Sequence, residues 1–215
     1  MLLPTFNFEL EYWKNGLDVL GVDEVGRGAF AGPLVLGGVI FPKNTIFHTK
    51  SLLFSINDSK LLTPQKRINL AKEIYASAIF ATTISIPVAT INKFGIGKAT
   101  QMGVRKLCMQ SRKIGECYML MDGFKIPRIR GFHKKQTVII KGDSLSYSIA
   151  AASIIAKVYR DDLMTSLHGK FDKYNFLENK GYGTKYHRDM IFKYGLSKIH
   201  RTSFALEKFL SIGEM

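Results

Sequence analysis

The stretch that decides the fold reads VLGVDEVGRGAFAGPLVLGGVIF, from Val19 to Phe41. An apolar run opens it, a glycine-rich segment follows, and a second apolar run closes it. Apolar runs on both sides of a glycine-rich turn are typical of two strands joined by a loop. Asp23 and Glu24 end the first run, directly before Gly26–Gly28. Two carboxylates beside flexible backbone suit a divalent cation near a phosphate, so we predict the catalytic floor here.

Length and charge bound the class of protein. The chain has 215 residues, 46% of them hydrophobic, which is enough for a sizeable core and argues against extensive disorder. Its 31 Lys and Arg residues against 17 Asp and Glu give a net charge of +14, which favours a polyanionic partner such as nucleic acid. A membrane surface is the alternative, but no basic amphipathic helix or lipidation signal supports it.

Cysteine usage and the N-terminal residues favour a cytoplasmic protein. Cys108 and Cys117 fit neither a disulfide framework nor a metal-ligand spacing, so we expect reduced structural thiols. The first 13 residues lack the basic segment and cleavage site of a signal peptide. The uncharged run from Ile74 to Asn92 contains Pro87 and polar residues, which indicates a helix end and a strand rather than a membrane span.

The rest of the chain predicts alternating helices and strands. Thr63 suits the N-cap of a helix and Pro64 its first position. Residues at helical spacing are expected on the buried face of that helix: Ile68, Ala71, Ile74, Tyr75 and Ala78. The later expected elements are a strand over 82–88, a helix over 91–111, strands over 118–121 and 137–140, and helices over 149–167, after Thr184, and over about 203–210.

Three of the predicted strands end in carboxylates. Asp23 and Glu24 end the first strand, Asp122 ends a middle one, and Asp143 follows a later one. Strand ends in one α/β sheet meet at an edge, so we expect these four acids to converge. Clustered carboxylates repel unless cations lie between them, and such oxygen ligands select Mg²⁺ or Mn²⁺. Two such ions suit the attack of water on a phosphodiester.

Each acid also has an ordinary structural interpretation. Asp122 lies in a common turn dipeptide, and Asp143 could cap a helix. Asp23 and Glu24 could form a solvated strand end. Asp161 and the acid after it follow an arginine within a predicted helix, which fits a charge-paired, solvated face better than a ligand set. Only the combination of strand-end acids with a basic chain points to nuclease chemistry.

Six motifs occur in a fixed order between about residue 20 and residue 204. They read GVDEVGRGAFAGPLV, NDSKLL, MDG, KGDSLSYSIAAASIIAKVYRD, KGYGT and GLSKIHRTSF. Together they resemble the bacterial ribonuclease HII family. The related ribonuclease HIII usually carries an extra N-terminal domain, for which we expect no room in the short leader. Tyr182 in KGYGT also favours type HII.

The resemblance implies an α/β fold in which helices flank an RNase H-like mixed β-sheet. A catalytic domain is expected over 1–168, with a small helical, substrate-binding C-terminal region over 169–215. It further implies an Mg²⁺- or Mn²⁺-dependent endonuclease that cuts RNA in RNA/DNA hybrids and 5′ of single ribonucleotides in duplex DNA. Such an enzyme leaves 3′-hydroxyl and 5′-phosphate ends and serves ribonucleotide excision repair and DNA replication.

The resemblance also assigns residues. The four catalytic, metal-holding acids of the family match Asp23, Glu24, Asp122 and Asp143. Its recognition loop matches Gly26, Arg27 and Gly28, and its junction-reading tyrosine matches Tyr182. A monomer is expected, and the sequence does not identify a replication-clamp or RNA polymerase partner.

Elementary chemistry supports the substrate-reading roles. A protein distinguishes RNA from DNA by contacting the 2′-hydroxyl, and glycines let backbone groups approach the sugar. Tyr182 could stack on the sugar or base beside the ribonucleotide. An ordinary turn at Gly26–Gly28, and a tyrosine that packs on its own domain, are the alternatives.

Several other polar residues leave two interpretations open. Lys60, Lys141 and Lys180 either meet phosphates or are solvated charges. Of the serines that could donate to phosphate, Ser144 and Ser153, the second is expected to pack in its apolar helix. The histidines His187 and His200 invite a general-acid role, but we interpret both as structural or substrate-flanking. A basic cluster within Lys125–Lys135 is expected to be a solvated loop that adds non-specific duplex affinity.

Two rival functions make different predictions. A non-catalytic nucleic-acid-binding protein predicts salt-sensitive binding without metal-dependent cleavage. A different nuclease of the same fold class, such as a junction resolvase, predicts cutting that is independent of any 2′-hydroxyl. The four acids argue against the first rival, because a pure binder gains nothing from acids that face phosphates.

Overall fold

The computed structural model describes residues 3–132 and 134–206, and a five-stranded mixed sheet forms their centre. The strands are β1 (Asp18–Val25), β2 (Leu34–Ile40), β3 (Phe80–Ile86), β4 (Cys117–Asp122) and β5 (Gln136–Ile139). Their order in the sheet is β3-β2-β1-β4-β5. β1 pairs antiparallel with β2 and β2 with β3, whereas β1–β4 and β4–β5 are parallel. The parallel pairs bring the ends of β1 and β4 to one edge.

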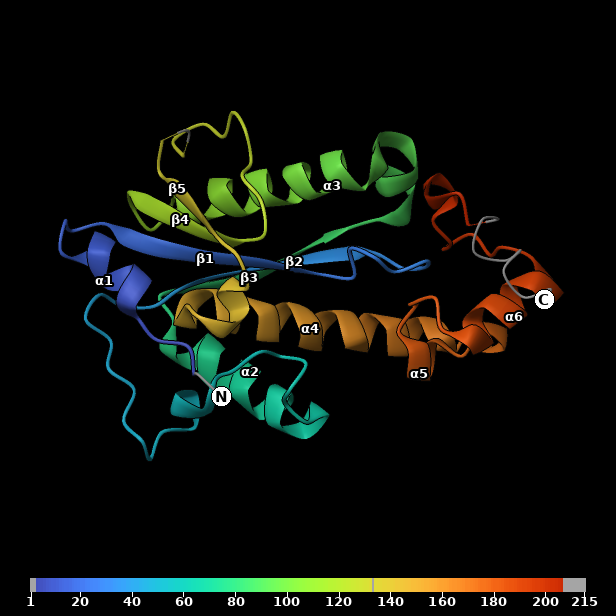
Figure 1. The fold of residues 1–215 in the computed structure, drawn as a ribbon, viewed down its shortest axis with the longest axis horizontal. Helices are drawn as coiled ribbons and strands as arrows, with labels where there is room; N and C mark the ends of the chain where they lie inside the picture. The colour runs from blue at the N-terminus through green and yellow to red at the C-terminus, as the bar shows by residue number, and fades with distance from the viewer. Residues whose placement is uncertain (1–2, 133, 207–215) are drawn as a thin grey trace.

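Helices cover both faces of this sheet, so the expected helix-flanked α/β fold is confirmed. The helix α3 (Val88–Ser111) lies on one face, and α4 (Tyr147–His168) and α2 (Pro64–Ser77) lie on the other (Figure 1). The shorter elements are α1 (Asn7–Trp13), α5 (Phe176–Asn179), α6 (Lys185–Tyr194) and the 3₁₀ turns η1 (Leu52–Ser55), η2 (Gly142–Ser144), η3 (Asp172–Tyr174) and η4 (Thr202–Phe204). None of the helices in the described ranges is long and apolar enough to cross a bilayer.

Helix α4 is the element on which the site depends. It begins at an N-cap, where the Ser146 hydroxyl accepts a hydrogen bond from the Ile149 N–H. Its first half is apolar, mostly Ala and Ile, and fully buried. Glycines on the sheet let it come close: a Cβ at Gly21 would lie 2.2 Å from the Ser148 carbonyl carbon, and one at Gly37 would lie 2.1 Å from Ala152 O. The backbone of α4 therefore rests directly on β1 and β2.

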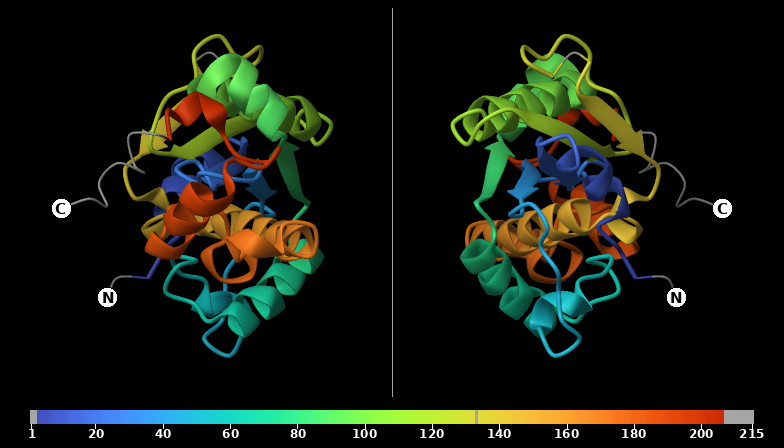
Figure 2. Two further views of the ribbon diagram at one scale, coloured as in Figure 1. Left: turned by 90° about the vertical axis from the view of Figure 1, so that its right-hand side faces the viewer. Right: turned by 90° about the vertical axis from the view of Figure 1, so that its left-hand side faces the viewer.

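The C-terminal elements gather at the far end of α4. Figures 1 and 2 show α5, α6 and the segment after them beside the end of that helix. They share an apolar cluster with Phe30, Ala31 and Met164. This packing brings residues near the C-terminus next to the segment that follows Gly26–Gly28.

The predicted buried face of α2 is partly wrong. Ala71 and Ile74 are buried, but Ile68 is 40% exposed and Tyr75 is 48% exposed. The buried stripe instead runs through Arg67, Leu70, Ala71 and Ile74. Ile68 and Tyr75 each lie one residue beyond a member of that stripe, which turns them about 100° around the helix, toward solvent.

Some boundaries also differ from the prediction. β3 ends before Val88, which begins α3 because Pro87 stops the strand and serves as the helix N-cap. The last predicted helix is wrong over its first residues, where Thr202–Phe204 forms a 3₁₀ turn. Its remainder, from residue 207, lies outside the described residues. Cys108 and Cys117 are free, buried thiols, as predicted.

The basic loop is solvated as predicted at Lys125, Arg128, Arg130 and Lys134. Lys135 is less exposed and forms an ion pair with Glu116. Three apolar side chains anchor the loop in the core below α3: Ile126, Ile129 and Phe132. His133 lies outside the described residues.

Candidate active site

The four predicted acids meet at one edge of the sheet. Val22 lies opposite Met121 in the parallel β1–β4 pair, so the next residues, Asp23 and Asp122, lie side by side where this pairing ends. The Gly142 N–H donates to Asp122 Oδ1 at 2.9 Å, which ties the end of β4 to the turn η2. Asp143 lies in that turn. These acids are far apart along the chain, and the pairing of the strands brings them close together in space.

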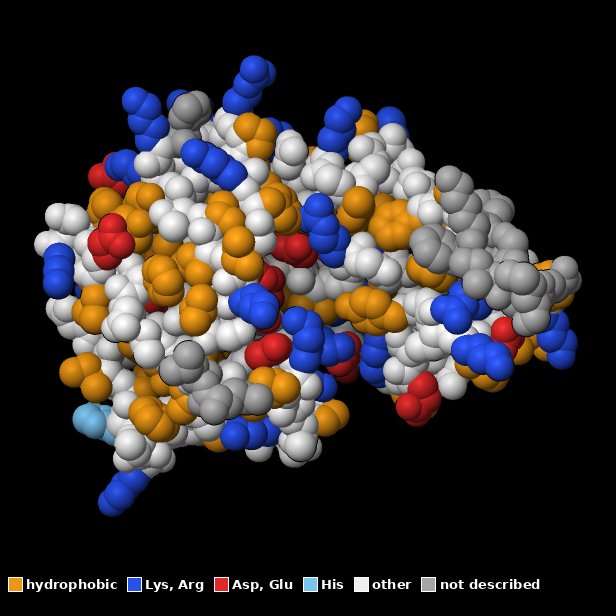
Figure 3. Space-filling view, in the orientation of Figure 1, with side chains coloured by type: hydrophobic (Ala, Val, Ile, Leu, Met, Phe, Trp, Pro, Cys, Tyr) orange, Lys and Arg blue, Asp and Glu red, His pale blue; other side chains and the backbone are white. Residues whose placement is uncertain are grey.

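All four acids line one cavity of about 470 Å³. The same cavity is lined by the predicted substrate-binding residues Gly26, Arg27, Gly28, Lys60 and Tyr182. Lys141 is exposed and is not among the described residues that line the cavity. In Figure 3, acidic side chains lie in the middle of this face with Lys and Arg around them. That arrangement offers cations a negative floor and offers a phosphate backbone a positive rim.

Burial and mutual repulsion disfavour the charged forms of the acids. The pKa of Asp23 is raised to about 7, chiefly by burial and also by the nearby Asp122 and Asp143, while a hydrogen bond from Ser153 opposes the shift. The pKa of Glu24 is raised to about 8, chiefly by burial and also by Asp23, while the Arg27 guanidinium opposes the shift. The pKa of Asp122 is raised chiefly by burial and also by Asp143. A divalent cation would relieve this repulsion and hold the acids ionised.

The donor set fits a hard cation. The buried Glu24 Oε2 atom has no hydrogen-bond partner, although buried carboxylate oxygens normally have one. Carboxylate oxygens from Asp23, Glu24, Asp122 and Asp143 are the ligands that Mg²⁺ and Mn²⁺ prefer. In residues 3–132 and 134–206, no group of three or more His, Cys, Asp or Glu side chains lies close enough together to hold a metal ion as the side chains stand. The four acids line one cavity, and a bound cation would have to draw their carboxylates together.

Lys60 is the cation nearest the acids. Its Nζ atom lies 3.4 Å from Asp143 Oδ2 and 3.8 Å from Asp58 Oδ1. Burial opposes the charge on Lys60, but Asp143 and Asp58 outweigh it and raise its pKa. The ammonium group is therefore held beside the acids.

The Gly26–Gly28 loop presents backbone to the cavity. Gly26 has φ +86°, and a Cβ there would lie 2.0 Å from Arg160 Nε, so only glycine fits. Gly28 is exposed with open space around it. The Arg27 side chain folds back, with Nη1 3.5 Å from Glu24 Oε1 and Cζ 4.3 Å from the Phe124 ring centroid. A ligand above the loop would thus meet N–H and C=O groups.

Tyr182 reaches the cavity from the opposite side. Its side chain is 36% exposed, and the Arg160 guanidinium lies 5.2 Å from its ring centroid. The neighbouring Gly181 has φ +82° and donates its N–H to Asn179 Oδ1. Lys180 points elsewhere, with its Nζ atom 2.8 Å from Thr165 Oγ1. The tyrosine ring is supported from below and open toward the cavity.

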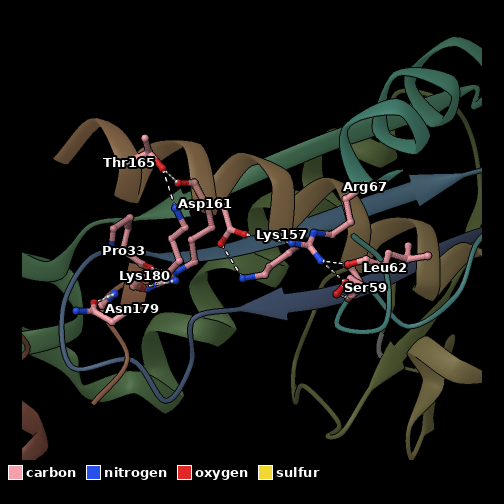
Figure 4. A network of polar contacts seen from close by, with 12 residues as sticks. Pro33, Ser59, Leu62, Arg67, Lys157, Asp161, Thr165, Asn179 and Lys180 are labelled. Atoms are coloured by element: carbon pink, nitrogen blue, oxygen red, sulfur yellow. Dashed lines mark hydrogen bonds and ion pairs between the residues drawn. The ribbon is translucent and has the colours of Figure 1, made fainter. Parts of the chain in front are cut away.

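Sequence reasoning missed a polar network along α4. Lys157 lines the cavity and forms a 2.7 Å ion pair with Asp161, which also pairs with Arg67 at 3.9 Å (Figure 4). Arg67 donates to the Ser59 carbonyl at 2.8 Å, and Ser59 Oγ lies 3.0 Å from Ser153 Oγ. The network fixes the loop that carries Lys60. The four-residue spacing between Ser153, Lys157 and Asp161 is the signal that could have found it.

Two buried arginines were also missed. Arg160 and Arg201 are both fully buried, and carbonyl oxygens accept their hydrogen bonds. Arg160 donates to Pro33 O, Ala31 O and Lys180 O at 2.9–3.3 Å. Arg201 donates to Gly32 O and, at 2.9 Å, to Arg27 O. The two guanidinium groups thus hold the Gly26–Gly28 loop and the Tyr182 loop from below.

A second cavity, of about 540 Å³, lies away from the acids. It lies between the N-terminal segment around Phe6 and the loop around Ile46, and its walls are almost wholly apolar. No carboxylate or cationic side chain lines it in the described part of the chain. The acidic cavity is therefore the better candidate for nuclease chemistry.

Comparison with known proteins gives the family. The model described as Ribonuclease HII matches residues 20–207. This chain belongs to the ribonuclease HII family. The ribonuclease HII of Wolbachia sp. subsp. Brugia malayi (strain TRS) is 43% identical over 199 residues, which cover 93% of each chain. That of Ehrlichia chaffeensis is 39% identical over 207 residues and covers 94% of this chain and 95% of its own.

Solved structures of ribonuclease H proteins share the fold. The ribonuclease HII from Archaeoglobus fulgidus, solved as a complex with PCNA, matches with a TM-score of 0.69 at 23% identity, over 86% of this chain and 94% of that one. Bst-RNase HIII in complex with Mn²⁺ matches with a TM-score of 0.70 at 20% identity, over 92% and 70%. These likenesses show the RNase H-like fold alone.

Family membership makes this chain a hydrolase that cuts within nucleic-acid strands. Ribonucleases HII depend on divalent metal and act on RNA in RNA/DNA hybrids. A non-catalytic nucleic-acid-binding role is therefore wrong for this chain.

Proposed function

We propose that this ribonuclease HII cuts the phosphodiester on the 5′ side of a ribonucleotide, both in RNA/DNA hybrids and at single ribonucleotides in duplex DNA. One observation carries the proposal: the four acids share a cavity with Gly26–Gly28 and Tyr182. The acids suit the chemistry, and the loop and tyrosine suit the reading of one sugar.

The proposed division of labour follows from the contacts. Asp23, Glu24, Asp122 and Asp143 would hold two divalent cations, Mg²⁺ or Mn²⁺, whose chemistry would be to activate a water and to stabilise the leaving oxygen. Lys60, already beside Asp143, neutralises the phosphate that enters. The products are a 3′-hydroxyl and a 5′-phosphate.

Sugar recognition belongs to the other wall of the cavity. Backbone groups of Gly26–Gly28 contact the 2′-hydroxyl, because open space around Gly28 lets a sugar approach the chain. Tyr182 stacks on the nucleotide beside the ribonucleotide. Residues from 169 onward, which include Tyr182, form a substrate-binding region on the catalytic domain of residues 1–168.

A duplex DNA with one embedded ribonucleotide tests the proposal. With Mg²⁺ or Mn²⁺, the enzyme should make a single cut 5′ of the ribonucleotide, and chelation of the metal should abolish it. An all-DNA duplex of the same sequence is the matched substrate and should stay intact. Equal cutting of both duplexes would overturn the proposal in favour of a nuclease that ignores the 2′-hydroxyl.

The assembly state is part of the same proposal. The enzyme acts as a monomer, and size-exclusion chromatography with light scattering should give the mass of one 215-residue chain. The complex of the Archaeoglobus fulgidus enzyme with PCNA supports a sliding clamp as a partner class to test.

A further inference from the structure

A pair of buried histidines lies behind Tyr182. His187 is 0% exposed and His200 is 1% exposed, and their Nε2 atoms are 3.0 Å apart. Tyr174 and Phe176 pack against both rings with centroid distances of 4.8–6.2 Å. Neither histidine lines the acidic cavity. The pair is therefore closed off from solvent and from the reacting phosphate.

The hydrogen bonds around the pair fix where each proton lies. The Ser197 backbone N–H can only donate, and it points at His200 Nδ1 at 2.9 Å, so that nitrogen carries no proton. A neutral His200 must then carry its proton on Nε2 and donate to His187 Nε2. His187 in turn carries its proton on Nδ1 and donates to the Tyr182 carbonyl at 2.9 Å.

Both rings stay neutral, which keeps this direction of donation. Burial lowers the pKa of His187, and burial together with His187 lowers the pKa of His200 to about 4. A proton added between the rings would set two N–H groups against each other. The chain of donors from Ser197 to Tyr182 is thus a fixed connection at neutral pH.

This connection joins the two parts of the protein that face the substrate sugar. One end holds the Tyr182 carbonyl. The other end belongs to the segment around His200, which forms a β-bridge with Ala31. The next residue, Arg201, donates to the Arg27 carbonyl within the recognition loop.

We propose that His187 and His200 are positioning residues that hold Tyr182 at a fixed place relative to the Gly26–Gly28 loop. The pair thereby sets how strongly the enzyme prefers a junction between a ribonucleotide and DNA. This inference rests on the proposed reading roles of that loop and of Tyr182. Neither histidine touches the substrate or transfers a proton to it.

The first test reads the proton positions without any substrate. Two-bond ¹H–¹⁵N correlation spectra of the wild-type protein at pH 7.5 should show His187 protonated on Nδ1 and His200 protonated on Nε2. The Nδ1–H form is the less common tautomer of a free histidine, so the result is distinctive. A His187 ring protonated on Nε2, or a doubly protonated ring, would overturn the proposal.

The second test compares two substitutions of one residue. His187→Asn places an amide N–H near the position of Nδ1 and keeps the donor to Tyr182. His187→Gln reaches toward the position of Nε2 and loses that donor. The test measures kcat and KM on a duplex with one ribonucleotide and on a continuous RNA/DNA hybrid. Thermal unfolding checks that both variants fold.

His187→Asn should keep the ratio of kcat/KM between the two substrates within about twofold of wild type. His187→Gln should lower that ratio by about threefold to tenfold, because a displaced Tyr182 matters most at the single-ribonucleotide junction. If both variants gave the same ratio of kcat/KM between the two substrates, the positioning role would be overturned. The proposed function would still stand as long as the wild type cuts the single ribonucleotide. If wild type itself fails to cut the single ribonucleotide, the proposed function fails, and the tautomer result alone decides whether the connection exists.

Discussion

The two walls of the cavity are built in opposite ways. The acidic wall gathers like charges at neighbouring strand ends and leaves Glu24 Oε2 without a hydrogen-bond partner. The opposite wall brings together segments around residues 30, 181 and 200, where carbonyl oxygens accept the bonds of two buried arginines. Burial and mutual repulsion disfavour the charged acids of the first wall, whereas the hydrogen bonds of the two buried arginines are satisfied in the second. Substitutions in the acidic wall should therefore impair cleavage of every substrate, whereas substitutions in the opposite wall should impair recognition of the ribonucleotide sugar.

The acidic wall should show the largest single effect. Asp23→Asn or Asp143→Asn removes a metal-binding charge and should reduce cleavage by about a thousandfold or more while the fold is kept. Asp162→Asn, on the exposed side of α4, is the matched control and should cleave like wild type. Undiminished turnover in either catalytic variant would remove that residue from the site.

The opposite wall of the cavity, which carries Gly26–Gly28 and Tyr182 and is called the reading wall below, should show a smaller effect that depends on the substrate. Tyr182→Ala removes a stacking platform, which costs on the order of tenfold in kcat/KM on a single embedded ribonucleotide. A continuous RNA/DNA hybrid should suffer less, and divalent-metal affinity should not change. Tyr186→Ala, half-exposed on α6, is the control. Equal losses on both substrates would mean that Tyr182 does not read the junction.

The hydrogen bonds that Arg201 donates beneath the reading wall should contribute to the free energy of unfolding. Arg201→Lys keeps the charge but replaces three fixed guanidinium donors to Gly32 O and Arg27 O with one ammonium group, so the free energy of unfolding should fall by about 1–3 kcal/mol. Urea unfolding measures the change, and Arg130→Lys in the exposed basic loop should change it little. An unfolding curve that matches wild type would show that these bonds do not hold the loop.

Without a cation, the acidic wall should make the protein less stable as pH rises. The folded-state pKa values of about 7 for Asp23 and about 8 for Glu24 lie above the ordinary values near 4, so the folded state binds more protons between about pH 4 and 8. Their stabilising contribution is complete below about pH 4 and is lost as pH rises through 7 and 8.

The size of this pH effect can be measured in urea. At about 1.4 kcal/mol per unit of pKa shift, the free energy of unfolding with chelator present should be on the order of 6 kcal/mol lower at pH 8 than at pH 5, and Mg²⁺ should reduce the difference. The variant with both Asp23→Asn and Glu24→Gln should show a flatter profile. A stability that rises with pH in the wild type, with chelator present, would contradict the raised pKa values of these acids.

The acidic wall was accessible from sequence because each acid follows a recognisable apolar strand pattern. Asp23 and Glu24 follow an apolar run, and Asp122 and Asp143 stand at similar strand ends, so alternation of strands and helices sufficed to bring them together. The exposed Ile68 on α2 was misassigned because apolar residues at roughly helical spacing do not reveal which stripe faces the core.

The reading wall was only partly accessible. Motifs pointed to Gly26–Gly28 and Tyr182, but Arg160 and Arg201 look like solvated charges in a basic chain. Their burial depends on carbonyl groups that only tertiary contacts supply. His187 and His200 were expected to be structural or substrate-flanking. Their separation in sequence does not predict that their rings form a hydrogen bond.

The claim on which all this depends is that four separated acids gather on cations. Crystals soaked in Mn²⁺ and measured at a wavelength where manganese scatters anomalously test it directly. The account predicts anomalous density in the cavity in contact with Asp23 and at least two of Glu24, Asp122 and Asp143. Manganese bound elsewhere, or held in the cavity without those carboxylates, would contradict it.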